Sequence, residues 1–361
     1  MSHFIFYLSD FSGGGAESVI VRISNEMILR NNSVTIIVDR IGGVMHSMID
    51  PKIEIIPLTA KSTLKKIFFI SGLLRTQKFE RFYTTLNKPN LVGFLSSCIA
   101  GKRKKHYARI AAVHSMSLKH TKSYKRKLLL FILTLTYRWF GNIVSVSEEV
   151  SLDLIKNYKV TENRIDKIYN PIKTVTNLES QNQIKPNGDT YLVLVVGRLV
   201  KQKNVNQIID VFNQFEKCYQ KVELNILGDG PELENLKLLT KKYGLTDKII
   251  FRGYIKNPDF YFQNSDLFIL FSSWEGLPNV VLDALNFNLQ IIVSDAPGGS
   301  KELVNYGRFG FITPVGDASA LLDTMHLAKN NPIDVCKTEK RTFLKKFDID
   351  NITSLYEGKK P

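Results

Sequence analysis

The sequence predicts an α/β protein of two domains, each built on a mainly parallel sheet. Strand-like apolar runs alternate with helical patterns along the whole chain, an order that favours parallel strands joined by helices. The chain has 361 residues, which is long for one doubly wound domain and suits two. A polar stretch near the middle interrupts the alternation, which then starts again.

The first half carries the signals of one complete domain. We expect one helix at Ala16–Leu29 and another that opens at Glu148. The expected strands are apolar runs bounded by turn residues. They are Phe4–Leu8, Val34–Val38, Ile53–Ile56, Phe82–Leu86, Arg109–Val113 and Ile143–Val146.

A polar segment with many turn residues, 173–189, is expected to be the linker. The predicted domains are therefore 1–172 and 190–340. The last residues, 341–361, are expected to form a C-terminal helix that can cross back to the N-terminal domain.

The second half repeats the pattern. Its expected helices are Asn204–Phe215, Glu232–Tyr243 and Asn279–Asn286. Its expected strands are Tyr191–Val196, Val222–Leu227, Ile249–Phe251, Leu267–Phe271 and Gln290–Ser294.

The net charge of +15 is concentrated in one stretch. No acidic residue occurs between Glu80 and Glu148, whereas the same window holds Arg109 and two basic runs at 102–105 and 125–127. Such a patch attracts polyanions. Because the second run leads into the apolar segment Leu128–Tyr137, we favour an anionic membrane surface over nucleic acid. A solvated basic face, an acceptor-binding surface and a core helix are the alternatives.

Neither a spanning helix nor a disulfide framework is expected. The longest apolar run is shorter than the ~20 residues that cross a bilayer. The three cysteines, Cys98, Cys218 and Cys336, are odd in number and lack metal-ligand spacing. We expect buried thiols in a reducing cytoplasm.

A glycine-rich turn, Gly13-Gly14-Gly15, lies between the first expected strand and helix. Glycines permit close backbone approach, and the free N–H groups at a helix start suit a phosphate. A tight turn without a ligand is an equal alternative. A lone histidine after an apolar strand is more often structural, but the place of His114 at the end of another expected strand favours a functional role more than its sequence context alone. His106 is expected in polar surroundings.

The loop after the first strand of the second half carries Arg198 and Lys203. Ligands bind at the carboxyl ends of strands in open α/β sheets. A guanidinium fork and an ammonium together neutralise a diphosphate well. A solvated basic loop is the competing interpretation.

Two carboxylates, Glu275 and Asp283, flank Pro278 after a later strand. Carboxylates accept hydrogen bonds from sugar or ribose hydroxyls. The next crossover, Ala296–Glu302, is also glycine-rich. Loops at successive strand ends converge on one cleft, so these segments are expected to form one site.

Together these motifs resemble family 4 of the retaining glycosyltransferases over nearly the whole chain, most strongly from Val195 to Val304. The resemblance implies the GT-B fold, two Rossmann-like domains facing each other across a cleft. Glu275 and Asp283 occupy the positions of that family's E-x7-E motif. The resemblance implies that Glu275 acts on the donor sugar and that Gly276, Leu277 and Asp283 bind nucleoside and sugar.

Further positions match the family's pattern. The resemblance places the donor diphosphate on Arg198 and Lys203 and on the loop of Gly14 and Gly15, with His114 near the reacting sugar. Asn170-Pro171-Ile172 resembles the family's hinge-side sequence. This chain departs at Asp283, where Glu is usual, so the ribose contact is expected to be weaker or water-bridged.

The implied function is retaining transfer from a nucleotide-sugar donor, with a UDP-sugar favoured, to a glycan or lipid-linked saccharide acceptor. Bacterial surface polysaccharide synthesis is the expected context. No cofactor, metal or nucleic acid is expected. The expected location is cytoplasmic and peripheral, on the inner face of the cell membrane.

Three alternatives stay open. A sugar-nucleotide epimerase of the same fold would use the same donor site. A glycosidase would use Glu275 and Asp283 as its carboxylate pair, but it has no diphosphate to occupy Arg198 and Lys203. A non-catalytic basic protein that binds a membrane or nucleic acid would leave both carboxylates unused.

Overall fold

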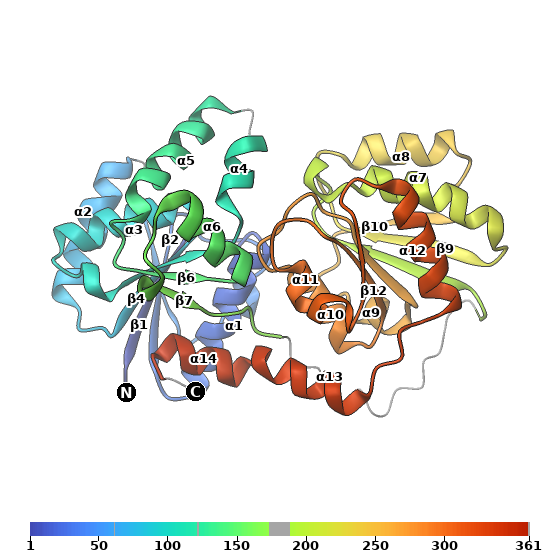
Figure 1. The fold of residues 1–361 in the computed structure, drawn as a ribbon. Helices are drawn as coiled ribbons and strands as arrows, with labels where there is room; N and C mark the ends of the chain where they lie inside the picture. Colours follow the sequence, from blue (N-terminus) through green and yellow to red (C-terminus); the bar gives the residue numbers. More distant parts are fainter. Residues whose placement is uncertain (61, 121–122, 173–187, 360–361) are drawn as a thin grey trace. The chain divides into compact units, whose positions relative to one another are not determined.

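The computed structural model describes residues 1–60, 62–120, 123–172 and 188–359, which form two compact units (Figure 1). Unit 1 comprises Met1–Pro171 and Lys345–Pro361, and unit 2 comprises Ile172–Leu344. Of the predicted linker, 173–189, only Gly188 and Asp189 belong to the described residues. Both units are Rossmann-like with parallel sheets, which confirms the predicted fold class.

Unit 1 is built on a seven-stranded parallel sheet in the order β3-β2-β1-β4-β5-β6-β7. The strands are β1 (His3–Leu8), β2 (Ser33–Val38), β3 (Glu54–Pro57), β4 (Arg81–Thr85), β5 (His106–Ile110), β6 (Asn142–Ser145) and β7 (Ile165–Lys167). Its helices are α1 (Gly15–Leu29), α2 (Thr63–Thr76), α3 (Asn87–Ile99), α4 (His114–His120), α5 (Tyr124–Tyr137), α6 (Glu148–Tyr158) and α14 (Ile349–Glu357).

Alternation along β1 gives this sheet two cores. Phe4 and Phe6 pack with residues of α1 and α14 on one face. Ile5 and Tyr7 pack with residues of α2 and α3 on the other face. Because successive side chains of a strand point to opposite faces, one apolar run serves both layers.

Unit 2 is built on a six-stranded parallel sheet in the order β10-β9-β8-β11-β12-β13. The strands are β8 (Tyr191–Val196), β9 (Val222–Leu227), β10 (Ile249–Gly253), β11 (Leu267–Leu270), β12 (Gln290–Ser294) and β13 (Phe311–Thr313). Its helices are α7 (Val205–Phe215), α8 (Leu233–Lys242), α9 (Asp259–Asn264), α10 (Asn279–Asn286), α11 (Ser300–Leu303), α12 (Ala318–Asn330) and α13 (Lys337–Leu344).

Helices also cover both faces of the second sheet. Residues of α7, α8 and α12 share one core cluster with β8 and β11. On the other face Phe262 of α9 packs on Phe268 of β11, with ring centroids 5.8 Å apart. In both sheets the first strand lies beside the fourth, a reversal of strand order at which open α/β sheets bind ligands.

Two local expectations are wrong. The strand predicted at Arg109–Val113 is His106–Ile110, because the register of β5 with β4 begins at the pair of His106 and Phe82. All three cysteines are exposed rather than buried. Cys98 lies on the outer side of α3, where its neighbours Ser96 and Ser97 take the inward positions.

Burial also corrects the interpretation of two polar residues. Arg109 is 1% exposed and so does not belong to a surface patch. Its guanidinium donates to Thr85 Oγ1 at 3.1 Å and to Asn170 Oδ1 at 2.6 Å. His106 is fully buried instead of lying in polar surroundings.

The imidazole of His106 has few polar neighbours. Its Nε2 lies 3.0 Å from Thr84 Oγ1, and the rings of Phe82, Phe94 and Phe140 surround it. Burial lowers the pKa of His106 to about 3. The folded protein therefore keeps this side chain neutral under mildly acidic conditions.

His106 is expected to make folding stability pH-dependent. Below about pH 6.5 the unfolded chain binds a proton at this imidazole and the folded chain does not, so stability is lost as pH falls. Between about pH 7.5 and pH 5 this group alone should lower the free energy of unfolding by about 2 kcal/mol. Urea unfolding at both pH values measures it.

The difference in the free energy of unfolding between the two pH values should shrink in His106→Phe. In His120→Phe, which alters an exposed histidine, this difference should stay as in the parent protein. Equal pH dependence in the parent and in His106→Phe would show that another group is responsible.

Candidate functional site

Two loops at neighbouring strand ends form the centre of the candidate site. One follows β8 and the other follows β11, the strands at which the order of the second sheet reverses. Backbone and side chain join the loops: Ser273 N donates to Gln202 O at 2.8 Å, and Asn204 Nδ2 donates to Phe271 O at 3.0 Å and Ser273 Oγ at 2.9 Å. The two loops therefore act as one rigid piece.

Lys203 and Glu275 form an ion pair between these loops, with Nζ 2.6 Å from Oε1. Their side chains are only 18% and 11% exposed. Partial burial strengthens the attraction, since less water screens the charges. The pair leaves two of the three ammonium donors of Lys203 for other acceptors.

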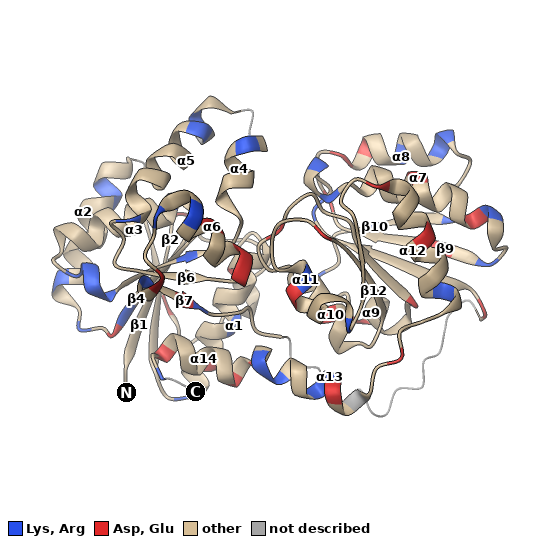
Figure 2. Ribbon diagram, in the orientation of Figure 1, with Lys and Arg blue, Asp and Glu red and all other residues tan. Residues whose placement is uncertain are grey.

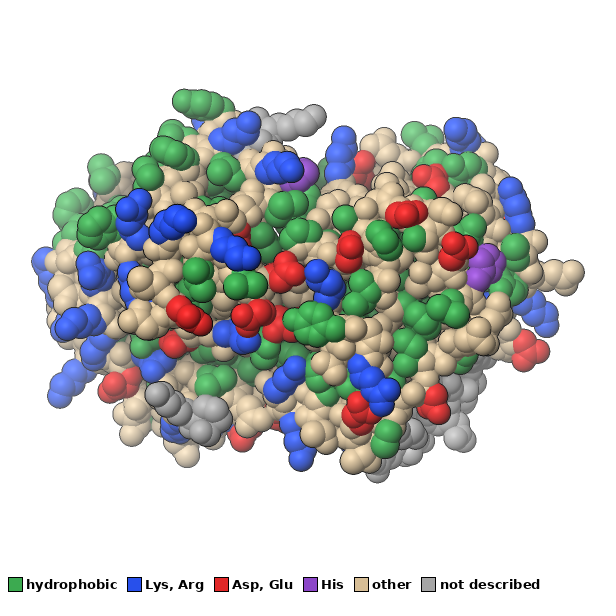
Figure 3. Space-filling view, in the orientation of Figure 1, with side chains coloured by type: hydrophobic (Ala, Val, Ile, Leu, Met, Phe, Trp, Pro, Cys, Tyr) green, Lys and Arg blue, Asp and Glu red, His purple; other side chains and the backbone are tan. Residues whose placement is uncertain are grey.

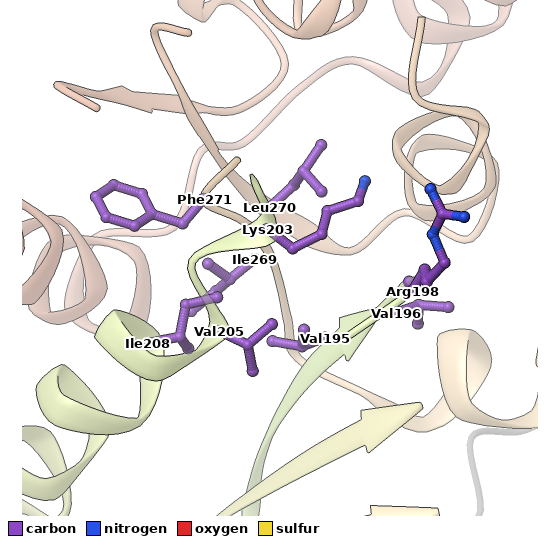
Figure 4. Close-up of a pocket in the computed structure, with 10 residues that line it drawn as sticks. Val195, Val196, Arg198, Lys203, Val205, Ile208, Ile269, Leu270 and Phe271 are labelled. Atoms are coloured by element: carbon purple, nitrogen blue, oxygen red, sulfur yellow. The ribbon is translucent and has the colours of Figure 1, made fainter. Parts of the chain in front are cut away.

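Arg198 differs from Lys203 in its surroundings. It is exposed, and its guanidinium makes no hydrogen bond or ion pair with the described part of the chain. Figure 4 shows the charged ends of Arg198 and Lys203 on the same side of the apolar side chains at the end of β8. A guanidinium in this position is ready to bind an anionic group in a bidentate manner.

Both cations line a small pocket whose other walls are almost entirely apolar. These wall residues come from β8, the start of α7 and the end of β11: Val195, Val196, Val205, Ile208, Ile269, Leu270 and Phe271. The site thus combines positive charge with a surface that excludes water.

A third loop, after β12, positions the backbone around Glu275. Glu275 N donates to Pro297 O at 2.9 Å, and Gly299 N donates to Gly276 O at 2.6 Å. Gly298 has φ +127°, and a Cβ at this position would lie 2.4 Å from Glu275 O. Glycine is therefore required at 298 for the loop to approach this closely.

The buried residues Gly276 and Leu277 lead from Glu275 to Pro278 and α10. Pro278 precedes the first residue of the helix, Asn279, as the sequence predicted. Asp283 lies in the second turn of α10 and is partly exposed. The structure thus places the predicted donor-site residues from Arg198 onward in unit 2, on the loops after β8 and β11 and on α10.

The remaining predicted residues lie in unit 1. Gly14 and Gly15 are exposed at the start of α1, after β1. A Cβ at Gly14 would meet only the flexible end of the Glu17 side chain, 2.3 Å from Oε2, and φ is −67°, so the backbone does not require glycine at this position. The N-terminus of a 15-residue helix, where the helix dipole favours an anion, lies at this point.

His114 begins α4, past the end of β5, and is 5% exposed. The hydroxyl of Tyr137 hydrogen-bonds to its imidazole, and the ring centroids are 5.2 Å apart. Burial raises the pKa of Tyr137 well above its usual value, so its hydroxyl stays protonated. Tyr137 therefore fixes the orientation of His114.

Sequence reasoning missed the roles of Tyr137 and Asn204. Tyr137 lies 23 residues from His114 on another helix, and no local pattern relates them. Asn204 adopts a left-handed conformation with φ 50° at the start of α7. Asparagine tolerates this conformation, so a turn was foreseeable but its bonds to the β11 loop were not.

No group of three or more His, Cys, Asp or Glu side chains lies together as a metal site in residues 1–60, 62–120, 123–172 and 188–359.

Two family models match the chain, one on each half. "Glycosyltransferase Family 4" matches residues 13–175, and "Glycosyl transferases group 1" matches residues 177–346. An uncharacterized glycosyltransferase of Haemophilus influenzae is 25% identical over 334 residues, which cover 91% of this chain and 90% of that protein.

A second relative has a more specific name. It is the N-acetylgalactosamine-N,N'-diacetylbacillosaminyl-diphospho-undecaprenol 4-alpha-N-acetylgalactosaminyltransferase of Campylobacter jejuni, 25% identical over 283 residues, which cover 76% of this chain and 74% of that protein. Among solved structures, Anabaena Alr3699/HepE in complex with UDP and glucose matches with a TM-score of 0.81. It covers 99% of both chains at 18% identity, which shows the shared fold.

Gly298→Ala is expected to destabilise unit 2, because the new methyl group meets the backbone of Glu275 and the positive φ is strained. We expect a loss of about 2 kcal/mol or more in the free energy of unfolding, measured in urea. Gly244→Ala is the matched control: φ is +69° there, but open space surrounds the Cβ, so only about 1 kcal/mol should be lost. Equal losses would contradict the close approach at Gly298.

Proposed function

Because this chain belongs to the family 4 glycosyltransferases with the GT-B fold, we propose that it transfers a sugar from a UDP-sugar to a lipid-linked saccharide, with retention at the anomeric carbon. The chain is a transferase enzyme; the donor, acceptor and stereochemistry are the proposal. Bacterial surface polysaccharide synthesis is its proposed context. The observation that carries it is the Lys203–Glu275 pair beside an unpaired Arg198 at the reversal of strand order.

The proposed role of Arg198 and Lys203 is to bind the donor diphosphate. As the bond between the anomeric carbon and the phosphate oxygen breaks, its electron pair and negative charge pass to the leaving diphosphate. Fixed cations at that point stabilise the transition state more than the ground state. Lys203 is already held by Glu275, so little reorganisation is needed when the donor binds.

Glu275 is proposed to contact the donor sugar and Asp283 the ribose hydroxyls. The ion pair with Lys203 holds the Glu275 side chain in place, and a carboxylate there can accept hydrogen bonds from sugar hydroxyls. Gly276 and Leu277 are assigned to the nucleoside and sugar. The proposal includes no protein nucleophile, cofactor or metal ion.

In unit 1, the proposal assigns phosphate binding to the backbone N–H groups at Gly14 and Gly15 and a position near the reacting sugar to His114. The hydrogen bond from Tyr137 supports the second assignment, because it fixes the imidazole in one orientation. A positioned histidine can stabilise charge or transfer a proton at the reacting group.

The acceptor and the location rest on two observations. The Campylobacter jejuni relative is named for an undecaprenyl-diphosphate-linked substrate. In this chain the exposed Arg103, Lys104, Lys125 and Lys127 lie in the stretch that has no acidic residue. We propose a peripheral position on the cytoplasmic face of the membrane. None of the described helices is both long and apolar enough to span a bilayer.

A donor screen tests the proposed function directly. The full chain is incubated with UDP-, GDP- and CMP-sugars and a mixture of lipid-linked saccharides, and products are identified by mass spectrometry. A product one sugar heavier, formed from a UDP-sugar only, is expected. Transfer from a GDP- or CMP-sugar alone would overturn the UDP assignment, and free sugar or an epimerised donor without transfer would overturn the proposed reaction.

Arg198→Ala and Lys203→Ala are each expected to weaken UDP binding by about tenfold to a hundredfold, because a charge-assisted hydrogen bond contributes about 1.5–3 kcal/mol. Isothermal titration calorimetry measures the affinities. Lys241→Ala, which removes an exposed lysine of α8, is the control and should bind as the parent protein does. Unchanged affinity in both site variants would remove the diphosphate from this position.

Glu275→Gln is expected to reduce kcat about tenfold or more, because the amide loses the charge that acts at the donor sugar and on Lys203. Initial rates with the donor found in the screen provide the measurement. Glu234→Gln, in an exposed carboxylate of α8, is the matched control. A rate within about twofold of the parent would exclude Glu275 from the reaction.

A further inference from the structure

Three helices lie side by side on one face of the first sheet. α3 packs against α2 on one side and α5 on the other, as Figure 1 shows. Their inward residues belong to the core, whereas their outward residues are largely apolar. Exposed apolar residues on a water-soluble protein are normally scattered singly, and a contiguous set marks an interaction surface.

The outward side of α5 is an apolar stripe with helical spacing. Tyr124, Leu128, Phe131 and Leu135 follow one another at intervals of four, three and four residues and are 79%, 46%, 53% and 47% exposed. Trp139, just beyond the helix, is 59% exposed. The inward residues Leu130, Leu133 and Tyr137 are buried, so the stripe is additional to what packing requires.

α2 and α3 extend this surface. Leu64 and Phe68 stand one turn apart on α2 and are 66% and 64% exposed. Leu95 and Ile99 stand one turn apart on α3. We call the outward sides of α2, α3 and α5 the three-helix face.

The charge around the three-helix face has one sign. From residue 62 to residue 147 the sequence has a single acid, Glu80. That residue lies just before β4, where its N–H donates to His3 O. Exposed cations accompany the apolar residues on the helices, among them Lys65 of α2 and Lys125 and Lys127 of α5. Figure 2 marks Lys and Arg positions on α2 and α5, and Figure 3 shows Lys and Arg side chains among hydrophobic ones over this part of the molecule.

We propose that the three-helix face inserts its apolar side chains into the headgroup region of an anionic bilayer. Lysines beside Trp, Tyr, Phe and Leu fit this environment, where cations meet lipid phosphates and apolar side chains meet acyl chains. A second copy of the face would bring like charges together, which disfavours self-association. The inference rests on the peripheral location proposed above and adds which surface is inserted.

Residues of α2 distinguish insertion of apolar side chains from purely electrostatic attraction to the membrane. It lies outside the stretch between Glu80 and Glu148 that suggested membrane binding, and its most exposed outward residues, Leu64 and Phe68, carry no charge. If attraction to basic residues alone held the protein, changes at these two positions would have no effect.

Vesicle sedimentation of the full chain tests the proposal. Vesicles of phosphatidylcholine with phosphatidylglycerol, at low salt, should bind the parent protein, and Leu64→Ser/Phe68→Ser should lower the partition coefficient about tenfold or more. Leu238→Ser is the control, because Leu238 of α8 is also 66% exposed but lies on unit 2. Equal binding of the double variant and the parent would overturn the proposal, as would a parent dimer that the double variant dissociates.

Trp139 provides a readout that leaves the face unaltered. In Trp274→Phe it is the sole tryptophan, since the chain has two. Brominated lipid should quench its fluorescence on vesicle binding; binding without quenching would overturn insertion. The affinity of the double variant for UDP, measured without vesicles, separates membrane insertion from the proposed donor. Normal UDP binding together with lost vesicle binding supports insertion by the three-helix face. Absent UDP binding in the parent protein counts against the proposed donor and leaves the insertion proposal unaffected.

Discussion

Parallel strands end together, and this constraint determines where the chemistry of each unit lies. The carboxyl ends of all strands meet at one edge, and the loops that leave β8 and β11 diverge to opposite faces because the strand order reverses between them. The gap between diverging loops is where Lys203 and Glu275 meet at 2.6 Å. Because β8 and β11 are neighbours in the sheet, Asn204 reaches the β11 loop and bonds to Phe271 and Ser273.

Within the site, the two cations Lys203 and Arg198 have different surroundings. Lys203 is paired and mostly buried, whereas Arg198 is exposed and has no partner among the described residues. A paired cation is held in position, and an unpaired one retains its full capacity for an anionic ligand. The glycine at 298 contributes by absence of a side chain, since it lets the β12 loop touch the backbone of Glu275. Rigidity of the site thus depends on hydrogen bonds between loops that are far apart in sequence.

The two faces of the first sheet are covered by different sets of helices. The C-terminal helix α14 covers one face, where Arg30, the residue after α1, bonds to Glu357 at 3.4 Å and Tyr83 donates to the carbonyl of Tyr356 at 2.5 Å. The opposite face is covered by α2, α3 and α5, whose outward sides stay apolar and positively charged. The same unit therefore has one side covered by its own C-terminal helix and another on which Phe68 and Phe131 are exposed.

The sequence by itself determined the elements whose signals are local. Tyr191–Val196, Val222–Leu227, Gln290–Ser294 and Asn279–Asn286 have the predicted bounds, because apolar runs, Pro278 and turn glycines act over a few residues. It also indicated Arg198, Lys203 and Glu275 as members of one site at strand ends. The tertiary structure alone decided the bond between Lys203 and Glu275, the burial of His106 and Arg109, the register of β5 and the short edge strands β7 and β13. Each of these depends on which strands lie side by side, and strand order is a long-range property that periodicity within one segment does not encode.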